Sequence, residues 1–410
     1  MTPSNQPGRS GRMRITDVFR EFFQSQQASG IILVAVTAAS LLISNSIGGN
    51  EYRSFWNIHF GTEVYGLHLN HSITDWINDA LMAIFFLVVG IEIKREIIDG
   101  ELSDRKRAML PLFGALGGMA VPALLYFLFN MNSPQTLSGV GIPTATDIAF
   151  AIAILGLLGN RVPTSLKVFL TALAIIDDLG AIVIIALFYG QGIHWAWLAA
   201  SVGIVVIMYI VNKIDWDFAW LYIVLGIALW FTMMHSGIHA TLSGVILALM
   251  LPRQSKKEKK MSNQMEHHLS GWVAFLILPL FAAANTAIKI DVNMMNEIIN
   301  PLSLGIFFGL VFGKPIGIVL FSWLADRLGI AHISKNITFT KLVGAGLLGG
   351  IGFTMSIFVS NLAFDDRALI DMAKLSIIIA SVTAATSGYI LLSKSKNVST
   401  RKEESRLSEI

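Results

Sequence analysis

Long apolar runs separated by short polar segments dominate this chain, and twelve of them predict membrane-spanning helices. A helix needs about 20 mainly apolar residues to cross the hydrocarbon core of a bilayer. Runs of this length favour helices over the shorter alternating strands of a membrane β-barrel. The seventh and eighth runs are closely spaced and could form one broken unit. The predicted spans are residues 29–48, 74–98, 108–129, 143–159, 164–188, 195–212, 218–234, 236–251, 270–288, 301–326, 340–362 and 369–393.

Two of the predicted spans are interrupted by glycine and proline. The fourth contains Gly139-Val-Gly-Ile-Pro-Thr-Ala-Thr-Asp147, and the eleventh contains Gly344-Ala-Gly-Leu-Leu-Gly-Gly-Ile-Gly352. Broken spans in corresponding places of two halves indicate a transport site. These two are the middle members of spans 3–5 and 10–12. They are seven spans apart, and because this number is odd, spans 10–12 cross the membrane in the opposite direction to spans 3–5. The pattern predicts inverted-topology repeats with two discontinuous crossing helices, the alternative being glycines that only permit close helix packing.

The composition fits a membrane protein. Hydrophobic residues make up 54% of the 410 residues and charged residues 14%, whereas a soluble domain carries about 25% charged residues. We therefore predict an all-α polytopic membrane protein. The chain has no cysteine, which excludes disulfides and thiolate chemistry. Residues 1–28 are polar and basic and lack the apolar stretch of a removable signal peptide.

The distribution of basic residues predicts the topology. Most of the 30 lysines and arginines fall on one side of the predicted membrane, and only Arg53, Lys289 and Arg367 fall on the other. Cytoplasmic segments collect basic residues, so the N-terminal segment 1–28 and the tail 394–410 are predicted to be cytoplasmic. They flank a membrane domain at 29–393. Basic stretches next to membrane spans indicate a role in setting the membrane topology and not in binding nucleic acid.

Residues 55–69, between the first two spans, predict a small external β-hairpin. The second half of the segment alternates between polar and apolar residues, and Gly61-Thr62 is a plausible turn. A lone hairpin is marginally stable in water. We therefore expect it to pack on another surface, such as a second copy of the chain.

Asp177 and Asp178 lie inside the apolar fifth span. A charge at membrane depth costs roughly 3 kcal/mol or more, and two adjacent carboxylates repel each other, so the pair favours protons or a bound cation. Oxygen ligands suit hard cations such as Na+ or Li+, and no cofactor is predicted. Adjacent helical residues point about 100° apart. One aspartate is therefore expected to pair with a buried cation, while the other faces a water-filled funnel.

Thr146, Asp147 and Lys314 are predicted to support this site. Asp147 lies in the first interruption, and Lys314 lies near the middle of the tenth span. Half-helix N-termini carry partial positive charge and C-termini partial negative charge. Asp147 could neutralise the former and Lys314 the latter. The alternative for Lys314 is that it snorkels to an interface.

Further titratable residues cluster at the predicted cytoplasmic side. Glu92 and Glu96 share one helix face at the end of the second span, and Glu266 and His267 lie at the start of the ninth. Histidine titrates near neutral pH, so the cluster predicts either a gate that responds to pH or solvated helix ends. His239, near the predicted outer face, has the same two interpretations.

These motifs resemble the NhaA family of bacterial Na+/H+ antiporters. The similarity extends from about residue 15 to 393. It is carried by residues 90–96 (GIEIKRE), 143–151 (PTATDIAFA), 174–181 (AIIDDLGA), 313–317 (GKPIG) and 350–356 (GIGFTMS). One departure is Ser270-Gly271 before Trp272, where the family leads us to expect His-Pro.

The resemblance implies a role for each candidate residue. Asp177 and Asp178 would carry Na+ or Li+ and the protons, and Thr146, Asp147 and Lys314 would belong to the crossing of the broken helices. Glu92, Glu96, Glu266 and His267 would form the cytoplasmic pH-responsive region, and His239 matches a histidine of the family. The external hairpin is similar to the one that joins family members into dimers.

The expected function is pH-regulated, electrogenic Na+(Li+)/H+ antiport across a bacterial inner membrane, with two protons exchanged per ion. Core spans at 108–188 and 301–393 would rock against interface spans at 29–98 and 195–288. The expected partners are Na+, Li+, H+, membrane lipids and a second copy of the chain. Such a protein is a secondary transporter and not an enzyme. The alternatives are an intramembrane aspartyl protease, whose Tyr-Asp and Gly-x-Gly-Asp motifs are absent, and a passive cation channel, which needs no titrating carboxylate pair.

Overall fold

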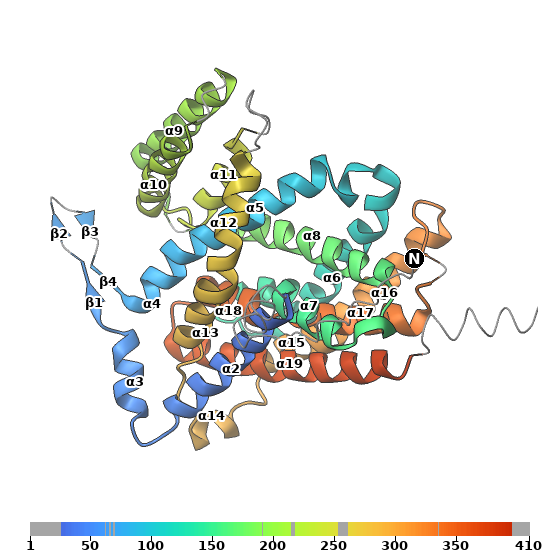
Figure 1. Cartoon of the computed structure of the whole chain (residues 1–410). Helices are drawn as coiled ribbons and strands as arrows, with labels where there is room; N and C mark the ends of the chain where they lie inside the picture. The colour runs from blue at the N-terminus through green and yellow to red at the C-terminus, as the bar shows by residue number, and fades with distance from the viewer. Residues whose placement is uncertain are drawn as a thin grey trace, which may run out of the picture.

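The structure is a computed structural model that describes residues 26–61, 63–64, 67–68, 70–190, 192–214, 218–252, 261–334 and 336–395. It is helical apart from four two-residue strands (Figure 1). The predicted cytoplasmic N-terminal segment 1–28 and tail 394–410 lie almost entirely outside the described residues.

Most of the longer helices follow the predicted apolar runs. The longer helices are α2 (Gln26–Ser44), α5 (Met82–Ile98), α6 (Arg105–Asn130), α8 (Thr164–Phe188), α9 (Trp195–Lys213), α10 (Ala219–Ser236), α12 (Met261–Trp272), α16 (Lys314–Arg327) and α19 (Arg367–Ser393). The shorter helices are α3 (Gly49–Trp56), α4 (Ile73–Trp76), α7 (Ile148–Leu157), α11 (Leu242–Met250), α13 (Leu278–Asn285), α14 (Val292–Asn296), α15 (Pro301–Phe308), α17 (Phe339–Gly349) and α18 (Phe353–Ala363). π-Helical turns join α4 to α5 (η1, Ile77–Leu81), α12 to α13 (η5, Val273–Ile277) and α15 to α16 (η6, Gly309–Gly313), and the 3-10 turns are η2 (Glu101–Ser103), η3 (Leu137–Thr144) and η4 (Gly159–Arg161).

Within the described residues, nine helical stretches are long and apolar enough to cross a membrane. The number rises to eleven if each of two bent pairs counts as one span, namely Ala28–Ser44 with α3, bent by 118°, and α17 with α18, bent by 44°. The eighth predicted span, 236–251, holds only the nine residues of α11. At 1.5 Å per residue these cover about 14 Å, roughly half of the hydrocarbon core. The chain is thus a polytopic helical membrane protein, and the count of twelve spans is not reached.

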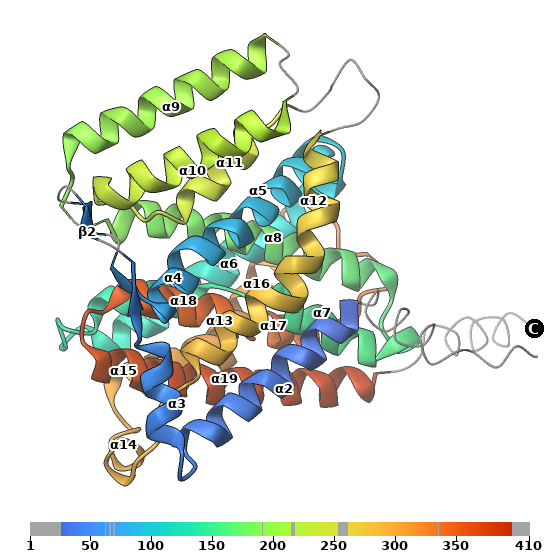
Figure 2. The ribbon, with the colours of Figure 1, turned by 60° about the vertical axis from the view of Figure 1, so that its left-hand side comes forward.

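The helices form one bundle with α9 and α10 at its outside (Figure 2). Both helices leave many large apolar side chains exposed, among them Trp195, Val202 and Trp220. Such a surface is suited to lipid. On the opposite side of α11, helix α5 packs so closely that a methyl group at Gly244 would meet the carbonyl oxygen of Ala83 at 2.0 Å.

A glycine contact between α6 and α16 determines where Lys314 lies. A side-chain methyl at Gly317 would come within 2.0 Å of the Gly117 carbonyl oxygen, and one at Gly117 within 2.2 Å of the Gly317 carbonyl oxygen. The two backbones can approach this closely only because neither residue has a Cβ. The contact lies one turn after Lys314, and η6 directly precedes that lysine.

Two short antiparallel strand pairs lie at the predicted hairpin, residues 55–69, and the last strand lies just beyond it. β1 (His59–Phe60) pairs with β4 (His71–Ser72), and β2 (Glu63–Val64) pairs with β3 (Leu67–His68). The register joins Val64 to Leu67, so the chain reverses after Val64 and not at Gly61-Thr62. Phe60 stacks on Trp76 with ring centroids 5.6 Å apart, and this contact attaches the strands to α4.

Candidate functional site

The two interrupted helices meet at their interruptions. The first consists of η3 and α7, with the break at Ala145–Asp147, and the second consists of α17 and α18, with the break at Gly350–Gly352. The backbone N–H of Asp147 donates to the Ile351 carbonyl at 2.6 Å. Unwound backbone at membrane depth needs hydrogen-bond partners within the protein. Here the N–H group of one break is bonded to a carbonyl of the other.

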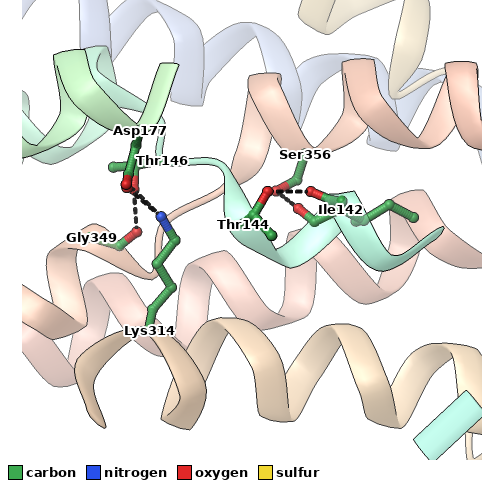
Figure 3. A network of polar contacts seen from close by, with 8 residues as sticks. Ile142, Thr144, Thr146, Asp177, Lys314, Gly349 and Ser356 are labelled. Atoms are coloured by element: carbon green, nitrogen blue, oxygen red, sulfur yellow. Dashed lines mark hydrogen bonds and ion pairs between the residues drawn. The ribbon is translucent and has the colours of Figure 1, made fainter. Parts of the chain in front are cut away.

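Hydroxyl groups satisfy the carbonyl ends of both first half-helices. Ser356, on α18, donates to the Ile142 carbonyl of η3 at 2.7 Å. Thr146, in the first break, donates to the Gly349 carbonyl of α17 at 2.8 Å. Each hydroxyl therefore comes from the opposite interrupted helix (Figure 3).

One carboxylate serves the N-terminal ends of both second half-helices. Asp147 is the N-cap residue of α7, where its side chain accepts the Phe150 N–H at 3.0 Å. Its other oxygen accepts the backbone N–H of Thr354 at 3.0 Å and the Thr354 hydroxyl at 2.6 Å. The N-cap residue of α18 is Gly352, which has no side chain to offer. Because helix N-termini attract negative charge, a single aspartate stabilises two of them.

Lys314 binds Asp177 in the centre of the protein. Its ammonium donates to the Asp177 carboxylate at 2.5 Å and to the Thr146 hydroxyl at 2.6 Å (Figure 3). The side chains of Lys314 and Asp177 are both 0% exposed. Thr146 is also 2.7 Å from the same Asp177 oxygen, but its single proton can be donated only to Asp177 or to Gly349 at one time. The ammonium therefore reaches the carbonyl end of α17 through the Thr146 hydroxyl.

Asp178 is also buried, yet its carboxylate is bonded to none of the described residues. One of its oxygens, Oδ1, has no hydrogen-bond partner, and the residue is 1% exposed. Asp178 lines a cavity of about 220 Å³ together with Asp147, Glu92 and Thr354. The adjacent aspartates are thus in different states: Asp177 is neutralised by an ammonium, and Asp178 faces open space.

The three glutamates of the predicted cytoplasmic cluster lie near one another, because Glu92 interacts electrostatically with Glu96 and Glu266. Glu92 lines the cavity of Asp178, and Arg95 forms ion pairs with both Glu96 and the buried Glu266. His267 is exposed beside the ring of His268. His239 lies elsewhere, in the loop between α10 and α11, where its Nε2 is 2.6 Å from the Tyr189 carbonyl.

Two hydroxyl residues for which no role was predicted take part in this site. Thr354 holds Asp147, and Ser356 holds the end of η3. Both lie in the motif Gly-Phe-Thr-Met-Ser directly after the second break. The available signal was the presence of hydroxyl residues next to a glycine-rich interruption of an apolar span.

Comparison with known proteins identifies the family. Residues 20–392 match the sequence profile of the family described as Na+/H+ antiporter 1. The chain belongs to this Na+/H+ antiporter family. The NhaA resemblance of the five motifs is thereby confirmed.

Curated members of the Na+/H+ antiporter family match nearly the whole chain. The Na(+)/H(+) antiporter NhaA of Cytophaga hutchinsonii is 48% identical over 93% of this chain and 96% of its own length. The one from Flavobacterium psychrophilum is 48% identical over 93% and 97%. Among solved structures, the sodium proton antiporter MjNhaP1 from Methanocaldococcus jannaschii has a TM-score of 0.48 and 16% identity, over 90% of this chain and 92% of that one.

Proposed function

We propose that this chain is a pH-regulated, electrogenic antiporter that extrudes Na+ or Li+ in exchange for two protons per ion. It acts by alternating access in a bacterial inner membrane, with both termini in the cytoplasm. The observation that carries the proposal is the unequal pairing of the adjacent aspartates. Asp177 is held by Lys314, while Asp178 stands unpaired in a cavity. A site in which one carboxylate is paired with an ammonium and its neighbour lines a cavity can exchange a proton for a cation.

The exchange of charges follows from these contacts. In the proton-loaded state, Asp178 holds a proton and the Lys314 ammonium neutralises Asp177. An arriving Na+ takes the place of both: Asp178 releases its proton, and Asp177 turns from the ammonium to the ion. The second proton comes from Lys314 or, if both carboxylates are protonated when the ion is absent, from Asp177. In either case two positive charges leave and one binds, so the exchange moves net charge.

The cavity of Asp178 supports an opening toward the cytoplasm in this state. Its rim includes Ser29, Glu92 and Ser270, which lie close to the basic helix ends that we assign to that side. Na+ would enter here and bind to the aspartates. Rocking of the core spans against the interface spans would then expose the site to the outside, where protons displace the ion. Oxygen from Thr146 and from the interrupted backbone would complete the coordination of the substrate cation.

The proposed pH response rests on acidic groups between the cytoplasm and the site. Glu92 shares the cavity with Asp178, and Arg95 links Glu96 to Glu266. Protonation of these carboxylates would weaken the links between α5 and α12 and reduce the negative charge that attracts Na+. His267, on the same helix as Glu266, would add positive charge at low pH. His239 is the proposed pH-sensitive group of the other side.

The strand pairs β1–β4 and β2–β3 are the proposed contact of a homodimer in the lipid bilayer. Short strands gain stability when a further strand or surface covers them. This part of the proposal is independent of the ion site. Cross-linking of native membranes through a cysteine at Phe60, in a chain that otherwise has none, tests it by the appearance of a dimer.

The test of the central proposal measures protons and charge together. Purified protein in proteoliposomes receives a Na+ pulse while a pH dye and a potential-sensitive dye are followed. The native chain should release protons and develop a membrane potential, and Glu297→Gln, an exposed acid in the loop before α15, should do the same. Na+ movement without proton movement would indicate a channel, and cleavage of an added transmembrane peptide would indicate a protease.

The source of the second proton can be determined with Lys314→Arg. A guanidinium keeps its proton in proteins, so this variant releases only one proton per Na+ if Lys314 is the native source. It releases two if both carboxylates supply them. Isothermal titration of Na+ in two buffers of different protonation enthalpy counts these protons.

A further inference from the structure

A second polar cavity lies at the opposite end of α18 from Asp147, on the side that carries few basic residues. It has a volume of about 490 Å³, and its lining includes Asp79, Asn361, Asp371 and Lys374. We call it the outer vestibule. Thr354, which bonds Asp147, and Asn361 lie on the same half-helix, about 10 Å apart along its axis at 1.5 Å per residue. In the proposed exchange, an ion released toward the outside along α18 would enter this cavity.

A chain of side-chain amides runs along the lining of the vestibule. Asn361 donates to Asn285 at 2.7 Å, and Asn285 donates to Asn78 at 2.8 Å. Asn78 is followed directly by Asp79 in η1. The chain thereby joins α18 to α13 and to the wall that carries Asp79. Among the described residues, the side-chain hydrogen bonds of these amides join them to one another and to the Phe281 carbonyl, and not to the charged groups of the vestibule.

Lys374 is the unusual residue of the vestibule. It lies two turns into α19 and is only 7% exposed. It interacts electrostatically with Asp371, three residues earlier, and with Arg367, which lines the vestibule together with Arg53. No hydrogen bond or close ion pair joins its ammonium to any residue in the described part of the chain, and the same holds for the carboxylates of Asp79 and Asp371. A buried lysine at membrane depth without a fixed partner is costly unless it has a function.

We propose that Lys374 and Asp371 set the affinity of the outer face for the transported cation, with the Lys374 ammonium acting as a tethered competitor. The ammonium shares the cavity with the carboxylates that a departing Na+ would meet. It lowers the occupancy of the vestibule by Na+, which favours release and disfavours return. Asp371 has the opposite effect, since it attracts the cation. The inference rests on the proposed antiport, to which it adds two residues outside the central site.

The size of the cavity gives the magnitude of the effect. A sphere of 490 Å³ is about 10 Å across, so an ion inside it lies within about 10 Å of the ammonium. At that distance a unit charge changes binding about sixteenfold at an effective dielectric constant of about 20, and about fourfold if the water raises that constant to about 40. Removal of Lys374 should therefore lower the apparent KM for outer Na+ by about fourfold to sixteenfold.

The test compares the two faces of the membrane for the same variant. Right-side-out vesicles loaded at low pH report the KM for Na+ at the outer face from the initial rate of Na+ uptake. Inside-out vesicles report the KM at the cytoplasmic face. For Lys374→Met the outer KM should fall by the stated factor, with the inner KM changed by less than twofold. For Asp371→Asn the outer KM should rise by about the same factor.

Two variants serve as matched controls. Lys374→Arg keeps the charge and should keep the outer KM. Lys289→Met removes an exposed lysine on the same side that does not line the vestibule, and it should also leave both KM values unchanged.

The proposal is overturned by equal shifts at both faces, by no shift at the outer face, or by the same shift in Lys289→Met. If Lys374→Met does not fold, the outer KM of Asp371→Asn tests the proposal instead. An unchanged outer KM in that variant refutes it. Failure of the antiport itself is distinguishable, because the native chain would then exchange no Na+ for protons at either face.

Discussion

Replacement of Lys314 by alanine should strongly destabilise the protein. The ammonium is fully buried and binds both the Asp177 carboxylate and the Thr146 hydroxyl. Its removal leaves a carboxylate with no counter-charge, together with the carbonyl end of α17, which the ammonium reaches only through Thr146. The variant therefore lacks the central charge pair of the site while the backbone contacts around it are retained.

The size of the loss can be worked out from this geometry. Breaking one partner of a buried ion pair costs about 3–5 kcal/mol, most of it from the uncompensated charge that remains. For domains of 150–250 residues each kcal/mol shifts the melting temperature by about 2–4 °C, and the shift becomes smaller with size. For this longer chain we expect a decrease of about 5–10 °C. A proton can replace the ammonium on Asp177, so the decrease should be larger at pH 8.5 than at pH 6.

The assay is thermal unfolding of detergent-purified protein, followed by intrinsic fluorescence. The double variant Lys314→Ala with Asp177→Asn removes both charges and should melt closer to the native protein than Lys314→Ala alone. Lys213→Ala, at an exposed lysine over the Tyr209 ring, is the matched control and should shift the melting temperature by less than 2 °C, since an exposed cation–π contact contributes about 0.5–1 kcal/mol.

Two results would refute this reasoning. A melting temperature of Lys314→Ala equal to that of the control would show that the ion pair does not contribute to stability. Equal destabilisation in the single and double variants would show that the lost packing of the lysine stem, and not the orphaned carboxylate, is responsible.

Three further predictions concern the site and its supports. Asp178→Asn should abolish Na+-dependent proton movement in everted vesicles, with an unchanged melting temperature, because its carboxylate bonds none of the described residues; normal antiport by the variant contradicts the site assignment. Gly317→Ala should destabilise by about 1–3 kcal/mol through overpacking of α6 against α16, seen as a lower melting temperature and slower transport, and a neutral effect would mean that the close backbone contact is relaxed in solution. Lys94→Met should destabilise by about 1.5–3 kcal/mol, since its ammonium donates to the Leu249 and Leu251 carbonyls at the end of α11, each at 2.7 Å; hydrogen exchange at the end of α11 should rise, and unchanged protection there would contradict this role.

The chemistry of the site could be predicted from sequence because charged residues are rare in membrane spans. Asp177, Asp178, Asp147 and Lys314 stand out against apolar neighbours, and the glycines and proline indicated the interruptions. The pairing of Lys314 could not be predicted. Both aspartates are on one helix, and the choice of Asp177 depends on the position of α16, which the Gly117–Gly317 contact determines.

Other features were beyond sequence patterns for a similar reason. The apolar run at 236–251 looks like a span, but a left-handed glycine, Gly237 with φ +85°, ends α10 and leaves a short α11. The hydrophobicity of a run shows that it is apolar and does not show where a helix ends within it. The reversal of the strands after Val64 likewise depends on the pairing of Val64 with Leu67. The sequence pattern predicted the turn at Gly61-Thr62, because glycine is a common turn residue.

The shared N-cap at Asp147 has a consequence for the two interrupted helices. Only the first has a counter-charge of its own, and Gly352 leaves the second dependent on a carboxylate 207 positions before the Thr354 that it binds. The second interrupted helix therefore cannot stabilise its own inner N-terminal end without the first, so any movement that separates the two breaks would expose the end of α18 before that of α7.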